Sequence, residues 1–150
     1  MSKNVLRWRS ELQKGIFQFE GKRPKIGDSI RVNAIKHWDG SVEEHEKNIA
    51  EIKECICVFE NIFVIKTNDD VFITERLNQN VSAKEKNYFI FAEKPPVVGN
   101  IILPNSCIRY HFHSLETNRV AHTGAVMKVL NLGDGIYRVI TQASTYLVIV

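Results

Sequence analysis

Four potential metal ligands lie close together in the second half of the sequence. They are Cys107, His111, His113 and His122. Zinc is held by three or four nitrogen and sulfur ligands in a tetrahedron, and the two histidines at 111 and 113 would share one face of a strand. The spacing matches no established zinc motif, so we favour histidines without a metal, keep zinc as the alternative, and predict no cofactor.

Acidic residues cluster beside an indole in the first half of the sequence. Trp38 precedes Glu43, Glu44 and Glu46 in a stretch, residues 37–48, that we predict to be a long loop or a short helix. Nothing in the sequence desolvates these carboxylates, so the raised pKa values of a glycosidase pair are not expected. An acidic loop can instead dock on a cationic surface, because complementary charge steers association. We therefore predict that these four residues contact a protein.

The first 25 residues form a basic arm. They carry seven Lys or Arg against two Glu, whereas residues 26–75 carry five basic and eleven acidic residues. Cations neutralise phosphates, and aromatic rings stack on unpaired bases. The residues that could do so are Arg7, Trp8, Arg9, Lys22 and Arg23. They support an alternative function, an RNA- or DNA-binding module, which the modest net charge of +3 favours less than protein contact.

Motifs for catalysis are missing from the sequence. There is no Gly-x-Ser-x-Gly elbow, and no cysteine sits in a recognisable nucleophile signature. Gly133-Asp134-Gly135 is typical of a hairpin turn rather than of a phosphate-binding loop. We therefore predict that the chain is not an enzyme.

Composition favours a globular protein of the cytoplasm. The 150 residues are 44% hydrophobic and 25% charged, close to the globular average. No stretch approaches the roughly 18–20 apolar residues of a membrane span, and no apolar signal core follows Met1. The three cysteines form an odd set, which indicates a reducing compartment. We expect no contact with a membrane.

Two parts of the sequence repeat one another. Pro24–Ile30 matches Pro96–Ile102 at an offset of 72 residues, and Asn61–Thr67 matches Gly135–Thr141 at an offset of 74. Because the order of the blocks and their hydrophobic phase agree, we predict a tandem duplication. The predicted domains are an N-terminal helix or arm (1–25), a first β unit (26–75), a connector with a strand (76–97) and a second β unit (98–150).

Short β-strands dominate the predicted secondary structure. Period-two alternation of β-branched and aromatic residues marks residues 62–67 and 136–141 as strands. Further strands are predicted at 16–19 and 88–91, and a short helix at 4–14. Turn clusters are predicted at 68–70, 133–135 and 142–144.

Within each unit, a Pro-x-Ile/Val-Gly-Asp/Asn strand entry precedes a variable loop and a three-strand meander. In the second unit the meander covers residues 124–129, 135–139 and 145–148. This order, over about two-thirds of the chain, resembles SH3-like small barrels of the Tudor and KOW types. The resemblance implies a mainly β fold of two tandem SH3-like small barrels with a short N-terminal helix.

The end of the sequence also resembles small uncharacterised proteins of phages and bacterial mobile elements. That resemblance implies a host protein as partner, and one concrete form is an inhibitor of a bacterial defence nuclease such as an anti-CRISPR protein. Small barrels expose loops and strand edges suited to macromolecular contact. Our leading prediction is therefore a non-catalytic intracellular binding protein whose partner is a macromolecule, a protein before a nucleic acid.

Overall fold

The computed structural model describes residues 11–77, 86–111 and 114–150 of the chain. These residues are mainly β, with twelve strands and a helical turn at residues 11–14. The rest of the predicted N-terminal helix lies outside the described residues. The chain divides into two units, Met1–Val81 and Ser82–Val150, each with its own sheet. Among the described residues, no helix is long and apolar enough to cross a membrane.

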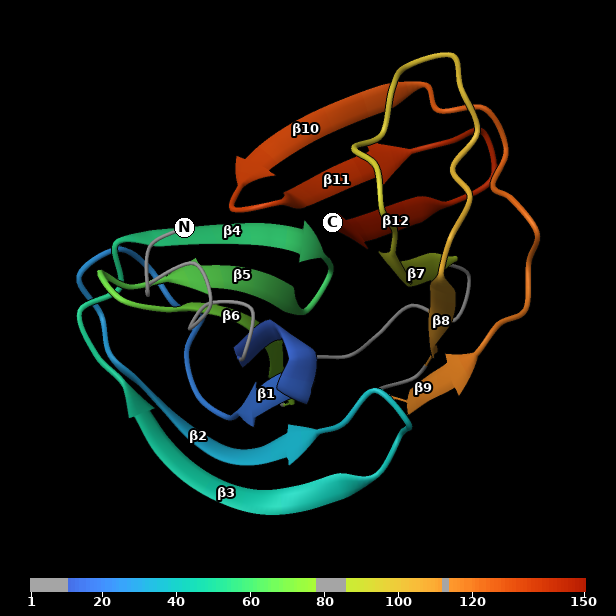
Figure 1. Ribbon diagram of the computed structural model, residues 1–150. Helices are drawn as coiled ribbons and strands as arrows, with labels where there is room; N and C mark the ends of the chain where they lie inside the picture. The colour runs from blue at the N-terminus through green and yellow to red at the C-terminus, as the bar shows by residue number, and fades with distance from the viewer. Residues whose placement is uncertain (1–10, 78–85, 112–113) are drawn as a thin grey trace. The chain divides into compact units, whose positions relative to one another are not determined.

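The first unit is a six-stranded sheet in the order β3-β2-β1-β6-β5-β4. Its strands are β1 (Ile16–Phe19), β2 (Ile30–Lys36), β3 (Val42–Ile49), β4 (Glu54–Phe59), β5 (Ile62–Lys66) and β6 (Val71–Arg76). The two central strands, β1 and β6, are parallel, and the other neighbours are antiparallel. Figure 1 shows the sheet curling strongly, so that β1–β3 and β4–β6 form two meanders joined at the centre.

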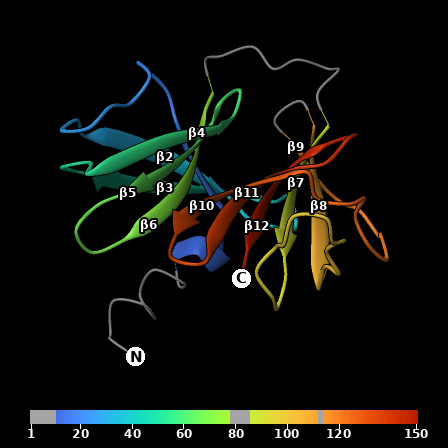
Figure 2. The same ribbon diagram turned by 90° about the horizontal axis from the view of Figure 1, so that it is seen from above.

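The second unit has the same topology. Its strands are β7 (Asn87–Phe91), β8 (Ser106–His111), β9 (Ser114–Thr117), β10 (Lys128–Gly133), β11 (Ile136–Ile140) and β12 (Thr145–Ile149). The sheet order is β10-β11-β12-β7-β8-β9, with β7 and β12 parallel at the centre (Figure 2). Counted from the start of each unit, both sheets therefore read 3-2-1-6-5-4, which is what a tandem duplication predicts.

The predicted closed barrels are wrong, because both sheets are open. The edge strands of one sheet, β3 and β4, do not pair with each other, and neither do β9 and β10 within the described residues. The two edge strands of each sheet are joined by the chain between them, at residues 50–53 in the first unit and 118–127 in the second. The Gly27 N–H donates to the Ile52 carbonyl, and the Gly99 N–H donates to the Val126 carbonyl, both at 2.8 Å. In each unit, this bond joins the loop between the first two strands to the segment that connects the two edge strands.

The strands predicted at 16–19 and 88–91 are the central strands of the two sheets. We had placed them in the N-terminal arm and in the connector, outside the repeated units. All four residues of β1 are buried, which is expected of a strand covered on both faces. The turns predicted at 68–70, 133–135 and 142–144 are confirmed, because they join β5 to β6, β10 to β11 and β11 to β12.

An aromatic contact spans the parallel strand pair at the centre of each core. The ring centroids of Phe17 and Phe72 lie 5.2 Å apart, edge to face, and those of Tyr88 and Tyr146 lie 5.3 Å apart, stacked. Such pairs stabilise a fold by roughly 0.5–1.5 kcal/mol beyond the burial of their area. The two contacts lie at different register positions, because Phe17 faces Thr74 of β6 whereas Tyr88 pairs directly with Tyr146.

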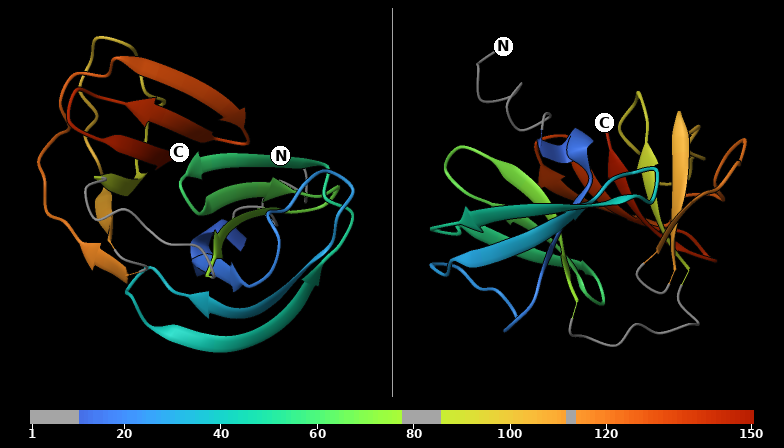
Figure 3. Two further views of the ribbon diagram at one scale, coloured as in Figure 1. Left: turned by 180° about the vertical axis from the view of Figure 1, so that it is seen from behind. Right: turned by 90° about the horizontal axis from the view of Figure 1, so that it is seen from below.

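Most of the stretch at 37–48 is strand β3, not the long loop or short helix that we predicted. The β2–β3 hairpin can be followed in Figure 3. The ring of His45 contacts Phe17 at 6.1 Å between centroids, the Lys47 Nζ lies 5.1 Å from the centroid of Phe72, and Ile49 is buried. Polar residues therefore occupy core-facing positions of β3, so its sequence lacks the alternation of apolar and polar residues that marks a strand. Charged residues also suit an edge strand, because they oppose the addition of a further strand.

Candidate binding surface

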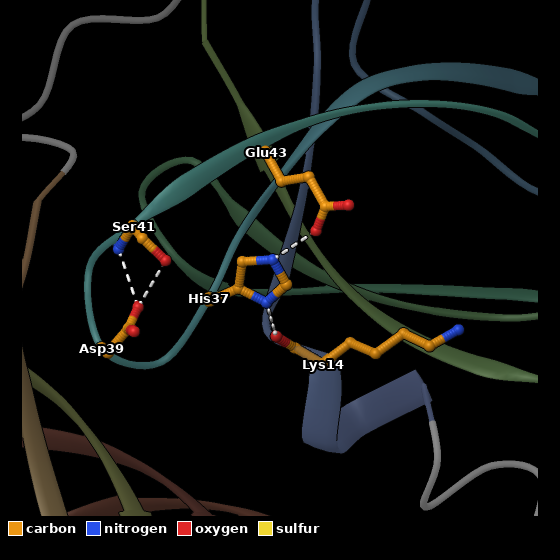
Figure 4. A network of polar contacts seen from close by, with 5 residues as sticks. All are labelled: Lys14, His37, Asp39, Ser41 and Glu43. Carbon is orange, nitrogen blue, oxygen red and sulfur yellow. Dashed lines mark hydrogen bonds and ion pairs between the residues drawn. The ribbon is translucent and has the colours of Figure 1, made fainter.

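A polar network joins the end of the β2–β3 hairpin to the helical turn at residues 11–14. His37 Nε2 lies 2.7 Å from the Glu43 carboxylate, and its Nδ1 lies 2.9 Å from the Lys14 carbonyl oxygen (Figure 4). Both partners are acceptors, so both contacts are hydrogen bonds only when the imidazole carries two protons. The hydrogen bond to Glu43 is the main reason that the pKa of His37 lies above 6.5. Both ring nitrogens of His37 therefore face acceptors within the fold.

We expect the hairpin contact to weaken as the pH rises. Because the folded-state pKa of His37 is raised, its stabilisation is fully present below the unfolded-state pKa and is lost as the pH rises through the folded-state value. An NMR titration of the His37 ring from about pH 5.5 to about pH 8.5 should give a pKa above 6.5. In Glu43→Gln the pKa should fall back toward 6.5, and an unchanged pKa would exclude Glu43 as its cause.

The structure separates the predicted protein-contact residues into two groups. Trp38 is partly buried, and its Nε1 donates to the Leu12 carbonyl at 2.9 Å, so the indole holds the helical turn against the hairpin. Glu43, Glu44 and Glu46 are exposed on the edge strand β3. The acidic residues therefore form an accessible edge, whereas the polar atom of the indole is used within the fold.

The predicted nucleic-acid residues fall largely outside the described residues. Arg7, Trp8 and Arg9 lie there, while Lys22 and Arg23 are exposed in the β1–β2 loop. The Arg23 guanidinium lies 5.6 Å from the centroid of Phe63. Five cations and four carboxylates alternate over residues 20–31 and 50–54, so this loop region has almost no net charge. It does not carry the basic excess of a nucleic-acid surface.

Two of the predicted metal ligands have other contacts, and one is not described. Burial raises the pKa of the Cys107 thiol, which disfavours the thiolate that a metal would bind. The His122 Nδ1 lies 2.8 Å from the Thr123 carbonyl oxygen, and His111 ends strand β8. His113 lies outside the described residues. Within the described ranges, no three His, Cys, Asp or Glu side chains are grouped to hold a metal ion.

Exposed apolar side chains gather around the β7–β8 loop of the second unit. We call this group the apolar surface, and its members are Val97, Val98, Ile101, Leu103 and Met127. Each is between 48% and 68% exposed. A contiguous exposed apolar patch on a protein marks an interaction site more often than chance.

Backbone hydrogen bonds hold the apolar surface in place. The segment containing Val126 bonds to both Gly99 and Asn100, which brings Met127 beside the loop. The Ile102 N–H donates to the Thr123 hydroxyl at 3.0 Å, and the Thr123 N–H returns a bond to the Ile102 carbonyl at 3.0 Å. The loop therefore has a fixed shape although its side chains point into solvent.

A pocket of about 380 Å³ opens beside the apolar surface. Its lining is mostly aliphatic and includes two consecutive prolines, with one carboxylate and one ammonium. The lining residues are Ala92, Glu93, Lys94, Pro95, Pro96, Val97, Asn100, Ile101, Ile102, Leu103 and Asn105.

The first unit shows that the fold does not require these apolar side chains. Gly27 and Gly99 have the same φ of 90°, and the hydrogen bonds around them correspond one to one. On that matched backbone, four apolar positions of the second unit are polar or charged in the first. Val97, Ile101, Leu103 and Met127 take the places of Lys25, Ser29, Arg31 and Lys53. At the fifth position, Val98 corresponds to Ile26.

The sequence analysis did not predict the apolar surface. Val97, Val98 and Ile101 were considered only as part of the repeated strand entry at 96–102, where the neighbouring Ile102 is buried. A usable signal was present in the repeat, because aligning the two copies shows where apolar residues replace charged ones.

No family model, curated protein or solved structure matches this chain.

Proposed function

We propose that this chain is a non-catalytic binding protein whose partner is another protein. The observation that carries the proposal is the apolar surface, which the second unit exposes where the first unit has lysine, serine and arginine. Exposed aliphatic side chains on a rigid loop can be desolvated by a partner with little loss of conformational entropy.

The paired variants Val98→Lys and Ile26→Lys test this proposal. Both residues are exposed, by 61% and 70%, and they occupy equivalent positions in the two units. We expect affinity capture from the source cells to recover a protein with the wild type and with Ile26→Lys. The same protein should be lost, by tenfold or more, with Val98→Lys, because a lysine within an apolar contact is desolvated without a partner. Equal capture by both variants would contradict the proposal.

A more specific form of the proposal concerns the acidic edge strand. As an inhibitor of a bacterial defence nuclease, such as an anti-CRISPR protein, the chain would use Glu43, Glu44 and Glu46 against a cationic groove. Their exposure on β3 supports this form. Changing all three to lysine is a further arm of the capture experiment. Loss of the partner in this arm, with capture retained by Val98→Lys, would move the contact from the apolar surface to β3.

The alternative function is RNA or DNA binding through the N-terminal arm. Nuclease treatment before capture distinguishes this alternative from direct contact with a protein, because a partner that is held through nucleic acid would then be released. The SH3-like relationship, which rests on the strand entry, the variable loop and the three-strand meander of each unit, is likewise a proposal. We also propose a cytoplasmic location, which is supported by the absence of a disulfide among Cys55, Cys57 and Cys107, all three of which are described.

A further inference from the structure

We infer that the apolar surface binds a short acidic segment of a partner protein. The segment would place an apolar side chain in the pocket beside Ile101 and Leu103, and its carboxylates near Lys94 and Lys128. This inference rests on the proposed function and adds the chemistry of the partner to it.

The pocket supplies the apolar anchor of this interaction. At about 380 Å³, it lies within the range of sites that bury small ligands and single large side chains. Pro95 and Pro96 stiffen one wall, and the bonds from the loop to Thr123 and Val126 hold the other side in position. A preformed pocket binds with a smaller entropic cost than one that must first become ordered.

The charge of the second unit favours a partner with carboxylates. The described residues of this unit carry six Lys or Arg against three Asp or Glu. Lys94 lines the pocket, and Lys128 follows Met127 in the sequence at the start of β10. Glu93 is the carboxylate at the pocket, and its neighbour Lys94 offsets it. An acidic segment would therefore approach in a favourable field.

The size and the composition of the surface favour a short segment over two other occupants, a second copy of the chain and a membrane. Five side chains exposed by roughly half to two-thirds form a patch on the order of 500 Å², less than the ~800 Å² per partner of a stable dimer. A short segment fits that size better than a second copy of the chain. Membrane-binding loops use tryptophan, tyrosine or phenylalanine beside their aliphatic residues. The apolar surface has only aliphatic side chains and methionine, and a concave pocket adjoins it.

Selection of displayed random peptides of about 12 residues on the whole protein tests this inference. We expect the enriched peptides to combine Asp or Glu with one or two large apolar residues. Binding of a selected peptide should weaken about tenfold in the double variant Lys94→Glu/Lys128→Glu. It should be unchanged in Lys22→Glu, which alters the position equivalent to Lys94 in the first unit. A new selection on the double variant should yield basic peptides.

The outcomes separate this inference from the proposed function. If Val98→Lys weakens the binding of the selected peptides but Lys94→Glu/Lys128→Glu does not, the inference that the partner segment is acidic is overturned, and the proposed function stands. Peptides indifferent to Val98→Lys would overturn both, as would the absence of any enrichment. Two further results would overturn the inference. One is sedimentation of the protein with vesicles of phosphatidylserine and phosphatidylcholine, and the other is a dimer in analytical ultracentrifugation, in each case if Val98→Lys abolishes the binding to vesicles or the dimer. Unchanged thermal melting of each variant confirms that it is folded.

Discussion

Replacing Gly15 with alanine should lower the free energy of unfolding by about 4 kcal/mol. Gly15 lies between the helical turn and β1, with a φ of 138° that side chains other than glycine rarely adopt. A Cβ at this position would collide with the Lys36 carbonyl oxygen and would lie 2.9 Å from the Cα of His37. Both obstacles are backbone atoms, so the end of β2 itself must move. Denaturant unfolding of the wild type and the variant measures the loss.

Gly21→Ala is the matched control for this experiment. Gly21 also has a positive φ, of 120°, but a Cβ there would meet no atom within 4 Å. Its replacement carries the backbone strain without the collision and should cost about 1 kcal/mol. Equal losses in the two variants would show that the close approach of Gly15 to β2 does not matter for stability.

Replacing Glu75 with alanine should cost about 3–5 kcal/mol. Its fully buried carboxylate on β6 accepts hydrogen bonds from the Gln18 amide at 2.7 Å and from the Lys36 ammonium at 3.2 Å. Alanine would leave the Lys36 charge buried without its carboxylate, and an isolated buried charge is strongly unfavourable. The measurement is again denaturant unfolding.

The exposed ion pair between Arg31 and Glu46 provides the comparison for Glu75. The two side chains are 69% and 73% exposed, and their charged atoms lie 3.2 Å apart. Glu46→Ala should therefore cost less than about 1 kcal/mol, because water screens the pair in both states. If the loss at Glu75 were as small as that at Glu46, the buried contact with Lys36 would not stabilise the first sheet.

The repeat and the meanders could be predicted from the sequence, but the closure of each unit could not. Strands such as Ile62–Lys66 and Ile136–Ile140 are rich in β-branched residues, and Asp, Asn or Gly stands in the turns at 68–70 and 133–135. Strand β3 escaped prediction because polar residues take core-side positions: the His45 ring lies edge to face with Phe17, and the Lys47 ammonium lies over the Phe72 ring. The parallel pairing of β1 with β6 depends on long-range contacts, which local patterning does not encode.

The candidate site was predictable only in part. Types and spacing of residues drew attention to Glu43, Glu44 and Glu46, and the structure does expose them. The same reasoning overlooked Val97 and Leu103, because a sequence does not show which apolar side chains are exposed. The Trp38 indole shows the opposite case, since its Nε1 is used within the fold. Charge is visible in a sequence, whereas the exposure of an apolar side chain is decided by tertiary structure.

The most direct test is to give the second unit the residues of the first. The variant carries Val97→Lys, Ile101→Ser, Leu103→Arg and Met127→Lys, and its free energy of unfolding is measured in denaturant. If these side chains serve a partner rather than the core, the value should stay within about 2 kcal/mol of the wild type. A loss above about 4 kcal/mol, as core substitutions give, would show that the surface belongs to the fold and would contradict its assignment as a binding site.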